Sequence, residues 1–102
     1  MAEPVLHHPR LAWDGARICV RVIESGHLCA WLDERLGLLL GPDFHRALFD
    51  SWDRLWWSER PDAPYVEAGL WRVRLEDCLR TRPDLAAPLH ALIQEATARL
   101  GT

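Results

Sequence analysis

Residues 42–57 read PDFHRALFDSWDRLWW, and this stretch carries the strongest helical signal in the chain. At about 100° per residue, its apolar side chains fall on one broad arc and its charged side chains fall on the opposite side. The arc comprises Phe44, Leu48, Phe49, Trp52, Leu55 and Trp56, with Ala47 at its edge. Pro42 and Asp43 suit the first turn of a helix, and Pro61 disfavours its continuation. An arc this wide predicts that two or more neighbouring elements cover the helix.

Three further segments have clear helical spacing. Apolar residues three and four positions apart predict helices over residues 27–40, 65–82 and 84–100. Pro88 falls early in the last of them, where it removes a backbone hydrogen bond. We therefore expect that helix to begin with a tightened turn, or to become regular only from Pro88.

Residues 17–23, RICVRVI, fit two structures. Ile18, Val20 and Val22 alternate with other residues as in a strand, and they are β-branched. Ile18 and Val22 are also four residues apart, as on one face of a helix. A strand here would pair with residues 70–75, LWRVRL, which alternate in the same way. We expect a mainly α fold, a compact bundle of four to five short helices. The alternative is an α+β fold with one short strand pair from residues 17–23 and 70–75.

The composition is that of one ordinary globular domain. The chain has 102 residues, of which 49% are hydrophobic and 26% are charged. We expect a flexible N-terminal arm at residues 1–10 and a single helical domain at residues 11–102. The net charge of −3 argues against a general nucleic-acid binder. All 12 strongly basic residues are arginine, which is typical of a GC-rich bacterial genome.

The sequence predicts a cytoplasmic protein without a membrane partner. The N-terminal residues lack the apolar core of a signal peptide. No apolar run in the sequence, residues 38–40 included, is long enough to cross a bilayer. Three cysteines, Cys19, Cys29 and Cys78, show no spacing of a disulfide framework, which fits a reducing compartment.

The best candidate for a metal site combines cysteine and histidine in the N-terminal half. It consists of His7, His8, Cys19, His27 and Cys29. Thiolate and imidazole groups suit zinc, but structural zinc sites usually contain tighter pairs such as CxxC. We predict no cofactor and no bound metal, although the sequence leaves open whether these five residues bind one.

Sequence motifs of catalysis are missing. The chain contains no GxGxxG, GxxxxGK[ST], HExxH, CxxC or GxSxG. His45 and His90 are interpreted as boundary or solvated residues. Asp50, Asp53 and Glu59 could supply a carboxylate pair, but they lie on or near an exposed face, where acids are usually solvated. We therefore predict that the protein is not an enzyme.

A second apolar face on the helix over residues 65–82 suggests where a partner binds. One face carries Ala68, Trp71, Leu75, Cys78 and Leu79, and a separate one carries Val66, Leu70 and Val73. A helix with two apolar faces is either sandwiched or presents one face to a partner. Trp57 projects among charged side chains, and tryptophan is enriched at interface hot spots. The predicted partner-binding residues are Trp57, Val66, Leu70, Trp71 and Val73.

These observations lead to two functional hypotheses. The first is a small non-enzymatic protein–protein interaction module: an adaptor, an accessory subunit or a homo-oligomerising helical domain. The alternative is a small nucleic-acid-associated subunit that uses phosphate contacts and stacking. Its binding residues would be Arg72, Arg74, Arg80 and Arg82, with Trp71 among them. Acidic residues interleave with these arginines, which favours a salt-bridged helix face instead.

Overall fold

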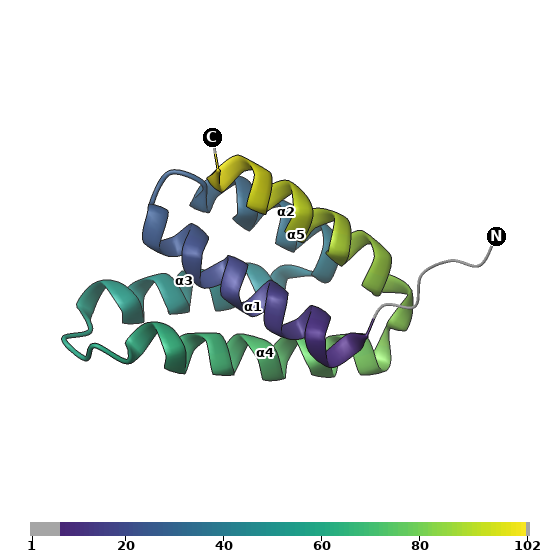
Figure 1. Cartoon of the computed structure of the whole chain (residues 1–102), viewed down its shortest axis with the longest axis horizontal. Helices are drawn as coiled ribbons and strands as arrows, with labels where there is room; N and C mark the ends of the chain where they lie inside the picture. Colours follow the sequence, from purple (N-terminus) through teal and green to yellow (C-terminus); the bar gives the residue numbers. More distant parts are fainter. Residues whose placement is uncertain (1–6, 102) are drawn as a thin grey trace.

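The computed structural model describes residues 7–101, and these residues form five α-helices and one short 3-10 turn, with no strand among them (Figure 1). The helices are α1 (His8–Ser25), α2 (Cys29–Leu40), α3 (Pro42–Trp57), α4 (Ala63–Thr81) and α5 (Ala86–Leu100), and the turn η1 (Pro83–Leu85) precedes α5. The predicted mainly α bundle is therefore confirmed. The α+β alternative is wrong, because residues 17–23 lie within α1 and residues 70–75 lie within α4.

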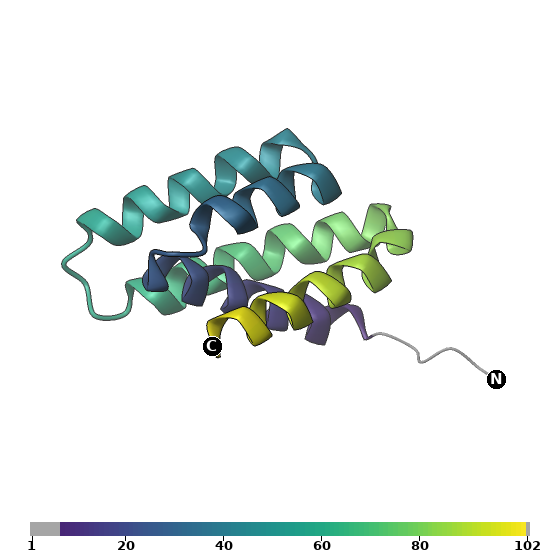
Figure 2. The same ribbon diagram turned by 90° about the horizontal axis from the view of Figure 1, so that it is seen from above.

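The helices are arranged around α1. Helices α3 and α4 run antiparallel and are joined at one end of the molecule by residues 58–62, while α1 lies across α4 (Figure 1). Seen from above, α2 and α3 form one side of the molecule and α5 lies on the other (Figure 2). The most extensive contact is between α1 and α4, and α1 also contacts α5, α2 and α3.

The central position of α1 explains why its sequence resembles a strand. Neighbours on several sides bury Ile18, Cys19, Val20, Val22 and Ile23, so apolar residues occur all around the helix. At Gly15 the approach of α4 is close, since a Cβ atom there would lie 2.8 Å from Leu75 Cδ1. The apparent alternation therefore reflects burial on more than one side of a helix.

Helix boundaries agree closely with the sequence except at the N-terminus. His7 caps α1, because its Nδ1 accepts a hydrogen bond from the backbone N–H of Arg10, 3.4 Å away. Residues 8–10 are therefore helical, although we predicted them to be part of the arm. Residues 1–6 of that arm lie outside the described residues. The tightened turn predicted before α5 is confirmed as η1.

Helices α2 and α3 are joined by a single residue. Gly41 has φ 107° and ψ 172°, a conformation that favours glycine over other residues. Its N–H donates to the carbonyl of Gly37 at 3.0 Å, which closes the last turn of α2. This short junction holds the two helices side by side, as the sequence predicted.

The core contains only part of the apolar arc predicted on α3. Phe44, Ala47 and Leu48 are buried, but Phe49, Trp52 and Trp56 are 63%, 37% and 68% exposed. The prediction that neighbouring elements cover the whole arc is therefore wrong. The reason is geometric: α4 meets α3 on the side of Ser51, so the buried face is displaced from the centre of the arc. Within residues 7–101, no helix combines the length and the apolarity needed to span a membrane.

Candidate functional site

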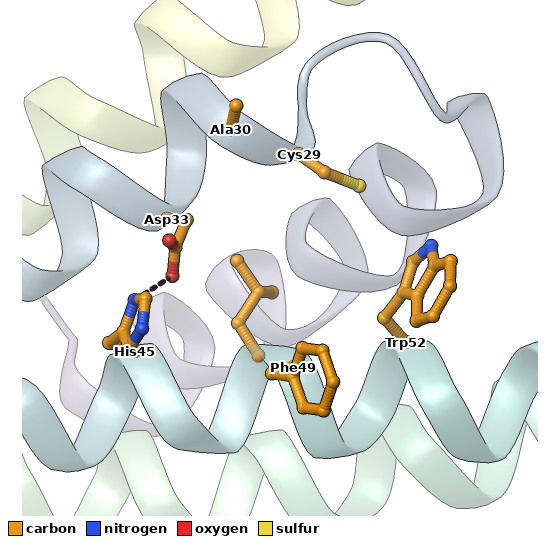
Figure 3. A pocket seen from close by; sticks show the side chains of 7 residues that line it. Cys29, Ala30, Asp33, His45, Phe49 and Trp52 are labelled. Carbon is orange, nitrogen blue, oxygen red and sulfur yellow. Dashed lines mark ion pairs between the residues drawn. The ribbon is translucent and has the colours of Figure 1, made fainter.

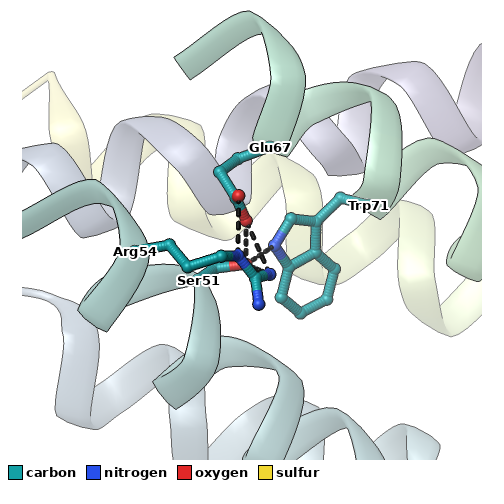
Figure 4. Close-up of polar contacts among 4 residues, drawn as sticks. All are labelled: Ser51, Arg54, Glu67 and Trp71. Carbon is teal, nitrogen blue, oxygen red and sulfur yellow. Dashed lines mark hydrogen bonds and ion pairs between the residues drawn. The ribbon is translucent and has the colours of Figure 1, made fainter. Parts of the chain in front are cut away.

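A buried polar cluster joins α3 to α4. Trp71 Nε1 donates to Ser51 Oγ at 2.8 Å, and Ser51 Oγ donates to Glu67 Oε1 at 2.8 Å (Figure 4). Arg54 donates to both carboxylate oxygens of Glu67, from Nε at 2.8 Å and from Nη2 at 2.9 Å. Glu67 is only 4% exposed, and Trp71 and Ser51 are fully buried. We call these four residues the buried junction.

The protonation state of the buried junction is fixed by its own hydrogen bonds. Burial alone would raise the pKa of Glu67, but the hydrogen bonds from Arg54 and Ser51 and the charges of Arg54 and Arg74 hold it below its ordinary value. The hydrogen bond to Glu67 in turn raises the pKa of Arg54. Glu67 is therefore a bound carboxylate that holds two helices together, with both of its oxygens engaged in hydrogen bonds.

The exposed aromatic residues of α3 form a continuous ridge. The Phe49 and Trp52 ring centroids are 6.2 Å apart, and those of Trp52 and Trp56 are 5.7 Å apart with an interplanar angle of 13°. The rings thus stack on one another along the outside of the helix. We call Phe49, Trp52 and Trp56 the aromatic ridge.

A shallow apolar groove of about 280 Å³ lies between the aromatic ridge and α2. Phe49, Trp52 and Leu48 line its α3 side, and Cys29, Ala30 and Asp33 line its α2 side. At one end, His45 Nδ1 lies 2.5 Å from Asp33 Oδ1, while Cys29 and Trp52 lie at the other end (Figure 3). The groove is therefore an apolar surface with one polar pair at its edge.

The cysteines of the fold are poor nucleophiles. Burial raises the pKa of Cys19 to about 12, partly offset by the charge of Arg74. Burial also raises the pKa of Cys29 and of Cys78. The Cys29 thiol donates to the carbonyl of Val22 at 3.6 Å, on the side of the groove away from His45. A thiol held in this way lacks the thiolate character that cysteine catalysis requires.

The candidate metal ligands are spread along α1 and beyond it. His7 and His8 lie at the start of α1, whereas His27 and Cys29 follow its end, and an 18-residue helix is about 27 Å long. Cys19 lies between them in the core. Within residues 7–101, no three His, Cys, Asp or Glu side chains are placed to hold a metal ion.

Four of the five predicted partner-binding residues lie at the surface. Val66, Leu70 and Val73 are each about half exposed on the outside of α4, and Trp57 of α3 is 74% exposed. Trp57 and Val66 line the same shallow hollow at the end of the α3–α4 pair. We call these four residues the α4 patch. Trp71 does not belong to it: the prediction was wrong for this residue, whose ring is buried beneath Phe44 and beside Arg74.

The predicted nucleic-acid residues are largely neutralised by neighbouring acids. Arg72 pairs with Glu76, Arg80 with Asp77 and Arg82 with Asp84. The Arg74 guanidinium lies 5.0 Å from the centre of the Trp71 ring, and its Nη1 is buried without a hydrogen-bond acceptor in the described part of the chain. Ion pairing on this scale leaves little excess positive charge for phosphates.

The sequence analysis missed two features, the buried junction and the exposure of the aromatic ridge. Glu67 occurs four residues before Trp71, at the edge of the apolar face of α4, where an acid needs a partner. Nothing in the sequence indicates that Arg54 and Ser51 provide it. The aromatic ridge was visible as apolar residues but was assigned to the core.

Comparison with protein-family models, with curated proteins and with solved structures gave no significant match.

Proposed function

We propose that this chain is a small, non-enzymatic protein–protein interaction module. The observation that carries the proposal is the aromatic ridge, in which Phe49 and Trp56 expose well over half of their surface along one side of α3. Exposed apolar surface of this kind is costly in water, and on soluble proteins contiguous apolar patches mark interaction sites. Tryptophan is also the residue most enriched at binding hot spots.

The α4 patch supplies a second surface of the same character. Val66, Leu70 and Val73 are exposed on the side of α4 away from its core residues, and Trp57 of α3 lines the same hollow as Val66. Their burial by a partner would complete a helix that is already apolar on its inner face. An accessory subunit or adaptor that contacts one protein on each side fits two such surfaces, and so does a homo-oligomer.

The experiment is quantitative affinity capture from the source cells with four versions of the tagged chain. They are the wild type, a Phe49→Ala/Trp56→Ala variant, a Trp57→Ala/Leu70→Ala variant, and an Arg21→Ala control on the exposed side of α1. Circular dichroism first confirms that all four are folded. We expect a protein that the wild type and the control capture in equal amount and that one of the two surface variants loses. If all four chains capture the same proteins, or none, the proposal is contradicted.

A further inference from the structure

We propose that the aromatic ridge binds a second copy of this chain, with the two α3 helices antiparallel across a two-fold axis. This inference rests on the proposed function, since it names the partner of one of the two surfaces. Three features support it: the spacing of the ridge residues, the charged residues beside the ridge, and a small side chain on the facing surface of α2.

The spacing of the ridge is that of a helix–helix seam. His45, Phe49, Trp52 and Trp56 are separated by four, three and four residues, which matches the a and d positions of a coiled coil. At about 100° per residue these four residues lie within an arc of about 60°. All four are exposed, and the three aromatic rings are stacked into one ridge. A second helix can therefore pack along α3 without displacing any part of the core.

The antiparallel direction pairs the apolar residues of the two copies in layers. With the two-fold axis between residues 50 and 51, Phe49 of each copy lies opposite Trp52 of the other. His45 then lies opposite Trp56. Phe49 and Trp52 thus form two adjoining aromatic layers at the centre, where aromatic pairs contribute beyond their buried area.

Under this two-fold symmetry, the charges that flank the ridge of one copy are complementary to those of the other copy. Arg46 follows His45 and Asp53 follows Trp52, so both occupy the position just outside the seam on its solvent side. Neither side chain makes a hydrogen bond or a short ion pair in the described part of the chain, and the charge of Asp53 acts only at longer range, on its neighbour Arg54. In the antiparallel pair, Arg46 of each copy and Asp53 of the other lie on the same side of the seam and within two residues of the same height, which gives two symmetry-related ion pairs.

A parallel pair does not offer the same match. In a parallel seam, the positions of Arg46 and Asp53 face the positions of Gly41 and Leu48 on the second helix. Gly41 has no side chain and Leu48 is buried in its own core, so neither charge would gain a partner. The antiparallel arrangement is also compatible with α2, because the groove wall there carries the small side chain of Ala30 near the two-fold axis.

The test reverses the two charges separately and then combines the variants. Arg46→Glu places acids opposite one another, and Asp53→Arg places arginines opposite one another, so each variant should weaken its own dimer about tenfold. Mixed in equal amounts, the two variants restore both ion pairs, and a 1:1 heterodimer should form nearly as tightly as the wild-type dimer. Arg21→Glu on α1 is the control, with an unchanged dissociation constant. Sedimentation equilibrium measures all five samples.

An aromatic variant gives the larger effect. Phe49→Ala/Trp56→Ala should weaken the dimer about a hundredfold, because it removes one aromatic anchor from the centre of the seam and one from its outer layer. Because both side chains are largely exposed in the monomer, its circular dichroism spectrum should not change.

Three results overturn the inference. They are a wild-type chain that is monomeric at its highest soluble concentration, charge variants that dimerise as well as the wild type, and a mixture that forms no heterodimer. A monomer that still captures a different protein through the ridge refutes the second copy as partner and leaves the proposed function standing. A monomer without any variant-sensitive partner contradicts both.

Discussion

Helix α3 contributes to both the buried junction and the aromatic ridge, but the tryptophans of these two sites differ in exposure to solvent. On one side of α3, Ser51 accepts a hydrogen bond from Trp71, whose ring is fully buried against Phe44. On the other side, Trp52 and Trp56 stack on each other, and Trp56 is largely in water. The comparison teaches that aromatic content alone does not identify a core. The buried indole of Trp71 donates its N–H to Ser51, whereas the rings of the ridge stack on one another and remain exposed.

If this contrast is correct, stability and association can be changed separately. Variants of the buried junction should lower the free energy of unfolding and leave the ridge available. Variants of the ridge should leave the free energy of unfolding of the monomer almost unchanged.

The largest effect is expected at the centre of the buried junction. Trp71→Ala should lower the free energy of unfolding by about 4 kcal/mol, because it opens a large cavity and leaves Ser51 without its donor. Urea denaturation followed by circular dichroism measures the change. Trp71→Phe keeps most of the volume but removes the hydrogen bond, and it should cost about half as much. A loss below about 1 kcal/mol for Trp71→Ala would contradict the assignment of this residue to the core.

A smaller loss is expected when the carboxylate of the buried junction is neutralised. Glu67→Gln keeps the shape but removes the charge that receives two hydrogen bonds from Arg54, and it should cost about 2 kcal/mol. The loss stays moderate because the Arg54 side chain is 48% exposed, so water solvates its charge when the pair is broken. Urea unfolding at neutral pH measures it. Glu59→Gln, in the exposed loop after α3, is the matched control and should have no effect.

The free energies of unfolding of the wild type and of Glu67→Gln should become more similar in acid. Since the pKa of Glu67 in the folded state is held below the ordinary value of 4.5, the unfolded chain binds a proton first as the pH falls. The contribution of the carboxylate is therefore complete above pH 4.5 and is lost as the pH falls through the folded pKa. We expect the difference in unfolding free energy between the wild type and Glu67→Gln to shrink as the pH falls below 4.5. A difference that stays constant with pH would show that Glu67 is not a bound carboxylate.

The sequence was sufficient to predict the helices of the α2–α5 segment but not how they meet. Pro42, Gly41 and Pro83 mark chain positions where helices must begin or end, so those boundaries followed from local chemistry. The two faces of α4 were also assigned correctly, since Val66, Leu70 and Val73 are exposed opposite the buried Leu75. Local periodicity determines which residues share a face.

For α1 the informative signal was the polar residues and not the apolar ones. Arg17, Arg21 and Glu24 are exposed and are spaced by four and three, as expected on one side of a helix. The apolar residues of this helix are buried on several sides, and for that reason they imitate the alternation of a strand. A helix at the centre of a bundle is best recognised from its narrow polar stripe.

The buried junction and the ridge could not be predicted because both depend on the relative position of helices. Arg54 and Glu67 meet only when α3 and α4 pack at one register, which no spacing within either helix determines. Likewise, a helical wheel groups Phe49 with Phe44 but does not say which of the two a neighbour covers. The burial of an apolar residue is a property of the assembled bundle.

The smallest effect on stability is expected at the ridge, and it completes the comparison. Phe49→Ala/Trp56→Ala should change the free energy of unfolding of the monomer by less than about 0.5 kcal/mol, because these side chains are already in water. The measurement requires dilute protein, since a dimer would add stability that depends on concentration. Phe44→Ala on the same helix is the control: its ring is buried against Trp71, so it should cost about 3 kcal/mol. If the free energy of unfolding falls as much in the ridge variant as in the control, the ridge belongs to the core of the monomer. The exposure of the ridge would then not support a binding partner.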